Sequence, residues 1–400
     1  MIKPKLRFPG FEGEWVAMAL NKLLFEPKIR NRNLKYEKND VLSVSGEYGC
    51  VNQIEHLGRS YAGVSVADYH VVEFGDVVYT KSPLKSNPYG IIKCNRGKPG
   101  IVSTLYAVYR PTKLSSGEFI DYYFQLDDHL NKYLRPIVRK GAKNDMKVNN
   151  TDVLKDDIYA PSLSEQQKIA DFLTEVDNKI QSLTQKKEAL SRYKKGLLQK
   201  LFPKAGKTVS ELRFPGFSGD WEKIPGNLLF ETVSDKKHDS DLPILAISQE
   251  FGAIPRDMID YKISVTDSSV NSYKVVNEGD FIISLRSFQG GIEYSNYRGI
   301  CSPAYIILRN KVELAKVYFK YYFKTKRYIQ ELNKKLEGIR DGKMISYKYF
   351  SEIKIPFPSL PEQQKIADFL TTVDNKITQV EKQITNITQF KKGLLQQMFV

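Results

Sequence analysis

Four polar stretches of this 400-residue chain hold residue types that contact nucleic acids, and they fall at matching places in its two halves. Each combines basic or amide side chains with glycine or proline, which suits hydrogen bonds to base edges and phosphates. One such stretch alone is more typical of a solvated surface loop, whereas the matched set favours contact with DNA. The candidate DNA-binding residues are Lys81, Lys85, Asn87, Tyr89, Arg139, Lys140, Lys143, Asn144, Arg286, Ser287, Gln289, Arg298, Arg340 and Lys343.

No catalytic residues and no metal site are predicted. Asn87-Pro-Tyr89 resembles the Asn-Pro-Pro-Tyr loop of adenine methyltransferases, but it lacks one proline and no glycine-rich cofactor turn precedes it. Gly206-Lys-Thr208 resembles the end of a phosphate-binding loop, but Leu201 stands where that motif requires glycine. The four histidines are scattered, and the three cysteines form no C-x-x-C pair that could hold zinc. We therefore predict a protein that recognises a partner and is not an enzyme.

The overall charge fits a polyanionic partner. Lysine and arginine number 61 against 46 acidic residues, which gives a formal net charge of +15, and such an excess attracts nucleic acids. Three cysteines make no disulfide framework, so a reducing compartment is expected. The sequence has no signal-peptide pattern and no apolar run long enough for a bilayer, so we expect a cytoplasmic protein with no membrane partner.

The chain consists of two tandem units, because two motifs each occur twice. The opening motif is LRFPGFEGEW at residues 6–15 and LRFPGFSGDW at residues 212–221. The second motif is EQQKIADFLTEVDNKI at residues 165–180 and EQQKIADFLTTVDNKI at residues 362–377. Short β-type runs separated by glycine fill the space between them, followed by aromatic amphipathic helices over residues 119–135 and 316–336. This pattern predicts two α+β domains with one scaffold and different loops.

A long helix follows each domain. Ser162 with Glu165, and Ser359 with Glu362, match the S-x-x-E capping box at a helix start. Apolar residues then recur in steps of four and three, which is the seam of a coiled coil. Each helix would be roughly 55–60 Å long, a length suited to a spacer. The seam positions are Ile169, Leu173, Val176, Ile180, Leu183, Lys187, Leu190, Lys194, Leu197 and Leu201 in the first copy, and Ile366, Leu370, Val373, Ile377, Val380, Ile384, Ile387, Lys391, Leu394 and Met398 in the second.

Other interpretations of these helices stay open at this point. They could be ordinary amphipathic helices that face their own domains. If they pair with each other, antiparallel pairing is favoured, since it relates the units by a pseudo-twofold axis, but parallel pairing is also compatible with the pattern. The lysines within the seam could extend to solvent, or mark a looser pairing or a site for a third partner. The predicted boundaries are domain 1–161, helix 162–202, domain 203–358 and helix 359–400.

The doubled motifs resemble the specificity subunit of type I restriction-modification systems. The resemblance rests on PSLxEQQKIADFL at residues 161–173 and 358–370, on YKKGLLQKLF at 193–202 with FKKGLLQQMF at 390–399, and on the paired opening motifs. It covers essentially the whole chain. It implies two target recognition domains that read a bipartite, asymmetric sequence in double-stranded DNA, and two helices that form an antiparallel coiled coil between them.

The same resemblance implies partner subunits that do the chemistry. Two modification subunits with S-adenosylmethionine would flip and methylate adenine at N6, and two restriction subunits would use ATP and Mg²⁺ to translocate and cut DNA. No cofactor is expected on this chain itself. The competing interpretations are a stand-alone DNA-binding regulator and a coiled-coil scaffold with incidental charge. The residues expected to dock the modification subunits are Glu165, Gln166, Asp171, Asp177, Glu362, Gln363, Asp368 and Asp374.

Overall fold

The computed structural model of the chain describes residues 2–140, 146–238, 241–259, 270–334 and 345–400. It divides into two compact units, which are Met1–Thr184 with Lys382–Val400, and Gln185–Glu381. Each unit therefore contains one globular domain, the beginning of the helix that follows it, and the end of the other long helix. Within the described ranges, no helix is both long and apolar enough to cross a bilayer.

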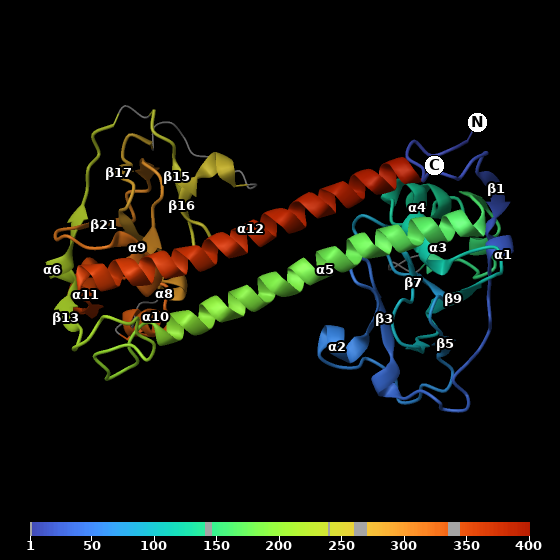
Figure 1. Cartoon of the computed structure of the whole chain (residues 1–400), viewed down its shortest axis with the longest axis horizontal. Coiled ribbons are helices and arrows are strands. Elements are labelled where there is room, and N and C mark those ends of the chain that lie inside the picture. Colours follow the sequence, from blue (N-terminus) through green and yellow to red (C-terminus); the bar gives the residue numbers. More distant parts are fainter. Residues whose placement is uncertain (1, 141–145, 239–240, 260–269, 335–344) are drawn as a thin grey trace. The chain divides into compact units, whose positions relative to one another are not determined.

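The first domain is built around a four-stranded antiparallel sheet (Figure 1). Its strands are β1 (Val16–Ala19), β2 (Leu24–Phe25), β3 (Leu42–Ser45), β4 (Gly49–Asn52), β5 (His70–Val72), β6 (Val77–Thr80), β7 (Ile92–Cys94), β8 (Gly100–Val102), β9 (Tyr106–Pro111), β10 (Arg139–Lys140), β11 (Met146–Lys147) and β12 (Asp157–Ala160). The central sheet has the order β2-β9-β6-β7, and the pairs β1–β12, β3–β4, β5–β8 and β10–β11 accompany it. Strand β6 is buried throughout, because Val77 and Tyr79 face the main core while Val78 packs on residues of β3, β4, β5 and β8.

The second domain repeats this topology. Its strands are β13 (Glu222–Pro225), β14 (Phe230–Val233), β15 (Leu245–Ser248), β16 (Gly252–Pro255), β17 (Lys274–Val276), β18 (Phe281–Ile283), β19 (Glu293–Tyr294), β20 (Gly299–Cys301), β21 (Ile306–Asn310) and β22 (Lys354–Phe357). The sheet β14-β21-β18-β19 corresponds to β2-β9-β6-β7, with β13–β22, β15–β16 and β17–β20 as the accompanying pairs. In both domains, a buried aspartate just before β6 or β18 binds an arginine on the strand that lies beside it in the sheet. Asp76 lies 2.8 Å from Arg110 of β9, and Asp280 lies 2.7 Å from Arg309 of β21. The predicted α+β class with two domains and long helices is confirmed.

Each domain also has short helices, most of which pack into its main core. They are α1 (Leu20–Leu23), α2 (Gln53–Leu57), α3 (Gly117–Tyr123) and α4 (Asp127–Leu134) in the first domain, and α6 (Gly226–Leu229), α8 (Ser287–Gly290), α9 (Lys316–Tyr322), α10 (Lys326–Asn333) and α11 (Tyr347–Glu352) in the second. The prediction of one helix over 119–135 and one over 316–336 is wrong, because each segment turns sharply and forms two helices. Thr325 Oγ1 accepts a hydrogen bond from the Tyr328 N–H at 3.3 Å and caps α10. The turn brings aromatic rings from both sides together, as with Phe323 and Tyr328 at 4.8 Å between centroids.

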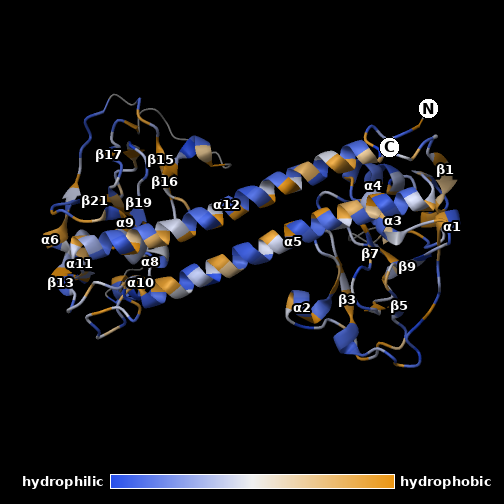
Figure 2. Cartoon of the chain, viewed as in Figure 1, coloured by the Kyte–Doolittle hydropathy of each residue, from blue (hydrophilic) through white to orange (hydrophobic). Residues whose placement is uncertain are grey.

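The two long helices are α5 (Leu163–Lys200) and α12 (Leu360–Met398). Every predicted seam position is buried or half-buried, and Figure 2 shows apolar residues recurring along both helices between polar ones. Ser162 Oγ accepts from the Glu165 N–H at 3.4 Å, as the capping motif predicts, although the Glu165 carboxylate binds elsewhere. The ends of the helices enter the domain cores, where Phe399 contacts Trp15 in the first unit and Phe202 contacts Tyr318 in the second.

Acidic residues of the opposite helix bind the three seam lysines. In the second unit, Lys187 lies 3.0 Å from Glu381 and Lys194 lies 2.5 Å from Asp374. In the first unit, Lys391 lies 2.6 Å from Asp177. The seam lysines therefore join the two helices through ion pairs rather than marking a gap in the pairing.

Candidate nucleic-acid interface

The predicted DNA-contacting stretches occupy equivalent loops of the two domains. Residues 81–91 connect β6 to β7, and residues 284–292, which include α8, connect β18 to β19. Lys85, Arg286 and Gln289 are exposed in these loops, and Arg298 is exposed after β19. Lys81 is half-buried, and desolvation lowers the pKa of its ammonium group.

Two candidates in these loops are buried structural residues, which corrects the prediction of DNA contact for them. Asn87 donates a hydrogen bond to Asp127 Oδ1 at 2.7 Å, and Ser287 Oγ accepts one from the Ser284 N–H at 2.8 Å. Asn87 is 7% exposed and Ser287 is 0% exposed. Tyr89 is half-buried against the main core, and its carbonyl accepts a hydrogen bond from the Tyr79 hydroxyl at 2.7 Å. These residues fix the shape of the loops, and the exposed residues face solvent.

The remaining candidates of the first domain surround β10 and β11. Arg139 is exposed on β10, beside a hollow of about 780 Å³ that is also lined by Lys147, Asn149 and Lys155. The ion pair of Lys155 with Asp152, at 2.6 Å, borders the same hollow. Lys140 belongs to β10, although its side chain lies outside the described part of the chain, as do Lys143, Asn144, Arg340 and Lys343.

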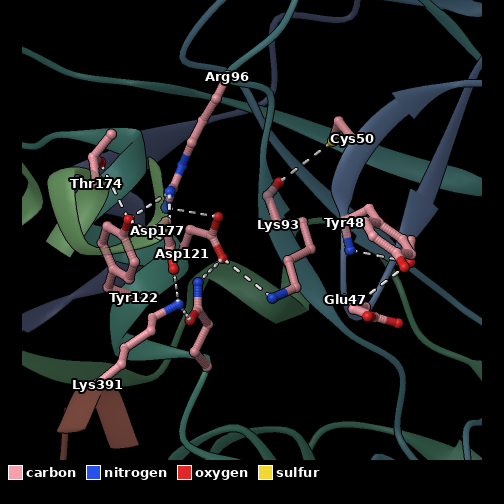
Figure 3. Close-up of polar contacts among 12 residues, drawn as sticks. Glu47, Tyr48, Cys50, Lys93, Arg96, Asp121, Tyr122, Thr174, Asp177 and Lys391 are labelled. Atoms are coloured by element: carbon pink, nitrogen blue, oxygen red, sulfur yellow. Dashed lines mark hydrogen bonds and ion pairs between the residues drawn. The ribbon is translucent and has the colours of Figure 1, made fainter. Parts of the chain in front are cut away.

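A buried polar network lies behind the loop of the first domain (Figure 3). Lys93 of β7 lies 3.5 Å from Asp121 of α3, and Arg96 lies 3.0 Å from the same carboxylate. Arg96 also donates to the Tyr122 hydroxyl at 2.6 Å, and its guanidinium lies 4.2 Å from the centre of that ring. Burial raises the pKa of the Tyr122 phenol, which stays protonated and donates to Asp177 of α5 at 2.9 Å. The network therefore links β7, the strand after the loop, to the long helix.

The second domain has the opposite charges at this place. Glu293 pairs with Ile282 of the central strand as Lys93 pairs with Val78, so the two residues occupy equivalent positions. Glu293 is 1% exposed and lies 2.5 Å from Lys324, whose side chain is 28% exposed. Lys320 lies within α9, in the position that Asp121 has in α3. Desolvation raises the pKa of Glu293 and lowers the pKa values of Lys324 and Lys320.

Replacing Lys324 with methionine is expected to make the stability of the second domain depend on pH. Glu293 would lose its counter-charge while buried, so its pKa in the folded state rises further above the unfolded value. Such a carboxylate favours folding below its unfolded pKa and opposes folding as pH rises through its folded pKa. We expect a loss of about 1–2 kcal/mol at pH 8, allowing for the partial exposure of Lys324, and a smaller loss near pH 5.

Urea unfolding between pH 5 and 8, followed by tryptophan fluorescence, measures this effect. The matched control is the double variant Glu293→Gln with Lys324→Met, whose difference from the wild type should not change over this range. A single variant whose loss is equal at pH 5 and pH 8 contradicts the expected role of the buried carboxylate.

The predicted docking residues of the long helices are largely engaged inside the chain. Glu165, Gln166, Glu362 and Gln363 are at most 2% exposed, so they present no surface to a partner. Gln166 Oε1 accepts from the Ser116 N–H at 3.1 Å, and Gln363 Oε1 accepts from the Ala315 N–H at 3.0 Å. This burial corrects the prediction of an exposed docking face for these four residues.

The four predicted aspartates differ from one another in exposure. Asp177 and Asp374 are half-buried, and each accepts a tyrosine hydroxyl and pairs with a seam lysine. Asp171 and Asp368 are exposed and accept from Gln167 and Gln364 of their own helices at 2.8 Å. Of the eight predicted docking residues, these last two have the accessibility that docking requires.

The residues that bind the two glutamates were missed from the sequence. Arg7 Nε and Nη2 donate to the Glu165 carboxylate at 2.7 Å, and Arg213 binds Glu362 in the same way at 2.8 and 2.9 Å. Each arginine belongs to an opening motif and also donates to backbone carbonyls of that motif. The sequence contained a signal for this pairing, because Arg7 with Glu165 recurs as Arg213 with Glu362 in the second copy of the two motifs.

Comparison with known proteins assigns the chain to a family. A sequence model described as the type I restriction modification DNA specificity domain matches residues 73–192 and 226–389, which is more than half of the chain. The chain belongs to this family. Each matched segment of this specificity-subunit chain includes one of the two equivalent loops and most of the long helix that follows it. The predicted family membership is confirmed.

Individual proteins resemble this chain in sequence or in fold over most of its length. The type I restriction enzyme MjaVIII specificity subunit of Methanocaldococcus jannaschii is 26% identical over 325 residues, which are 75% of this chain and 73% of that protein. The type I restriction-modification system S subunit from M. genitalium has a crystal structure with a TM-score of 0.60 at 14% identity, covering 100% of this chain and 99% of that chain. A structure from work on assembly and conformational transition of the type I R-M system gives 0.52 at 18% identity and 98% coverage of both chains. These structures share the fold of this specificity-subunit chain.

Proposed function

We propose that this chain is the DNA sequence-recognition subunit of a type I restriction-modification complex and reads a bipartite, asymmetric site. The observation that carries the proposal is that one scaffold occurs twice with different exposed loop residues. Lys85 is exposed in the loop after β6, whereas Arg286 and Gln289 are exposed in the loop after β18. Since base edges are read by such side chains, equivalent loops of different composition suit two different half-sites.

The long helices are proposed to form an antiparallel coiled coil that sets the gap between the half-sites. The ion pairs support this direction. Lys187 precedes Lys194 by one heptad, whereas its partner Glu381 follows Asp374 by one heptad. The pairing of Asp177 with Lys391 in the first unit has the same register. Polar residues within a seam fix register and direction, which a spacer requires.

The chemistry is proposed to reside in partner subunits, with this chain as a non-catalytic member. Two modification subunits with S-adenosylmethionine would methylate one adenine at N6 in each half-site, and two restriction subunits would use ATP and Mg²⁺. Flipping an adenine costs unstacking energy, which contacts from the recognition domains would offset. Because the target is host and invading DNA, we place the complex in the cytoplasm.

Methylome sequencing of the host, with the gene intact and deleted, tests the proposed function. Deletion should remove one bipartite N6-methyladenine motif, whose two parts and gap are then read directly. Co-purification of the tagged chain with a methyltransferase should accompany this result. A host that loses no motif, with a chain that retains no methyltransferase, contradicts the proposal.

Replacing Arg286 with alanine should change recognition at one half-site only. The side chain is exposed in the loop of the second domain, where a bidentate base contact contributes about 1–3 kcal/mol of discrimination. Methylation should become permissive at bases of one half of the motif and stay strict in the other half. Lys223→Ala, an exposed change in β13, is the matched control. Relaxed recognition at both halves, with the fold intact, contradicts the assignment of this loop.

A further inference from the structure

An identical turn lies at the tip of one β-hairpin in each domain. Strands β3 and β4 are joined by Ser45-Gly-Glu-Tyr-Gly49, and strands β15 and β16 by Ser248-Gln-Glu-Phe-Gly252. Both hairpins have the same register, since Ser45 pairs with Gly49 and Ser248 pairs with Gly252. The common pattern is serine, any residue, glutamate, an aromatic residue and glycine.

The hydrogen bonds of the two turns are the same. Ser45 Oγ accepts from the N–H groups of residues 47 and 48 at 3.3 and 3.2 Å, and Ser248 Oγ accepts from those of residues 250 and 251 at 3.2 and 3.3 Å. Gly49 and Gly252 have φ values of +69° and +75°, which side chains with a Cβ rarely adopt. A three-residue loop followed by such a glycine is a common hairpin closure. The serine and the glycine thus hold the turn in one shape.

That shape presents an aromatic ring to solvent in both domains. Tyr48 is 59% exposed and Phe251 is 56% exposed. Leaving a large apolar side chain outside the core forgoes the stabilisation that its burial would give. The same exposed ring at the same tip of two diverged domains therefore indicates contact with a ligand.

Both tips lie beside the loops that are proposed to contact DNA. In the second domain, Gln249 Nε2 donates to the Arg286 carbonyl at 3.0 Å. In the first domain, a Cβ placed on Gly46 would lie 3.9 Å from Leu84 of the loop after β6. Basic residues flank these tips, with Lys85 in the first loop and Arg286 in the second. The aromatic tip and the loop therefore form one continuous surface in each domain.

We propose that Tyr48 and Phe251 contact bases of the DNA, one in each half-site, by inserting between neighbouring bases and stacking on them. This inference rests on the proposed function and adds residues that the loops alone did not include. An aromatic ring can stack on any base, since every base has a π-face. This explains why the turn is common to both domains while the neighbouring loops differ. The exposed carboxylates of Glu47 and Glu250 repel phosphates, which directs the tip toward bases rather than the backbone.

The test uses the purified complex of this chain with its methyltransferase partner. The probe is a duplex that carries the bipartite motif found by methylome sequencing, with 2-aminopurine placed at successive positions of each half-site other than the adenine that the methyltransferase flips. Binding of the wild type should raise 2-aminopurine fluorescence at one step in each half-site, because the contacted base loses its stacking partner. Tyr48→Ala should abolish the signal in the half-site read by the first domain alone, and Phe251→Ala in the other alone. Affinity should fall about 10-fold or more in each case.

Matched controls separate this effect from a general loss of apolar surface. Phe74 is 63% exposed after β5, and Leu228 is 55% exposed on α6. Phe74→Ala and Leu228→Ala should retain the fluorescence change in both half-sites. Tyr48→Trp and Phe251→Trp keep an aromatic ring and should therefore show the fluorescence change that the alanine variants lose. Retention of the fluorescence change in Tyr48→Ala and Phe251→Ala overturns the inference while leaving the proposed function intact. A wild-type complex without specific binding to the probe would instead contradict the proposed function.

Discussion

Replacing Glu362 with alanine is expected to lower the free energy of unfolding of the second unit by about 3 kcal/mol. Glu362 is 2% exposed and accepts three hydrogen bonds, two from Arg213 and one from Trp221 Nε1 at 3.1 Å. Its loss leaves the indole N–H and the guanidinium without their carboxylate partner. Arg213 is 19% exposed, so water can replace part of what it loses, and we expect the lower end of the range for a broken buried pair.

Urea unfolding followed by tryptophan fluorescence measures this loss. The chain has two tryptophans, Trp15 and Trp221, so Trp15→Phe leaves a reporter in the second unit alone. Lys365→Ala, an exposed change on the same helix, is the matched control and should shift the free energy by less than about 0.5 kcal/mol. The equivalent change Glu165→Ala should cost less, because Glu165 binds Arg7 while Trp15 Nε1 has no hydrogen-bond partner among the described residues. Equal losses in Glu362→Ala and Lys365→Ala would contradict the anchoring role of this carboxylate.

Lengthening both long helices by one heptad is expected to abolish methylation of the original motif and to create a motif with a longer gap. Insertion of seven residues after Thr184 in α5 and after Gln383 in α12 keeps the apolar seam and all three ion pairs within their own units. Seven residues add about 10 Å of helix, which corresponds to about three base pairs. The two half-site sequences should stay unchanged, because the recognition loops are not altered.

Methylome sequencing of the variant strain reads the new motif directly. Insertion in α5 alone is the control, since it shifts Lys187 and Lys194 away from Glu381 and Asp374 and should abolish methylation at every gap length. A double insertion that still methylates the original motif contradicts the role of the helices as the spacer.

The long helices could be predicted in detail because their pattern is local and regular. A seam that repeats every seven residues fixes which face is buried, and every predicted seam position is at least half-buried. The same local reasoning failed at residues 119–135 and 316–336, where apolar periodicity continues across a turn. Contacts between Phe323 and Tyr328 on either side of that turn favour two short helices over one long helix.

The candidate interface was predicted less well because its details depend on distant partners. Asn87 resembles an exposed loop amide, yet it binds Asp127 forty residues later in the sequence and is buried. Glu165 was interpreted through Ser162, its near neighbour, although its carboxylate binds Arg7. Loop composition therefore indicated loops with exposed side chains, but which of their side chains reach solvent was decided by tertiary contacts. The aromatic turns would have been found by searching for all short matches between the repeats.

The opposite charges at the equivalent strand positions have a consequence for folding. Two domains of the same topology in one chain can exchange strands while they fold, which is a characteristic failure of repeated proteins. If β7 packed on the helices of the second domain, Lys93 would meet Lys320 and Lys324. If β19 packed on α3, Glu293 would meet Asp121. Each exchanged assembly would bury like charges against one another, whereas the correct assembly pairs opposite charges, so each strand selects the helix of its own domain.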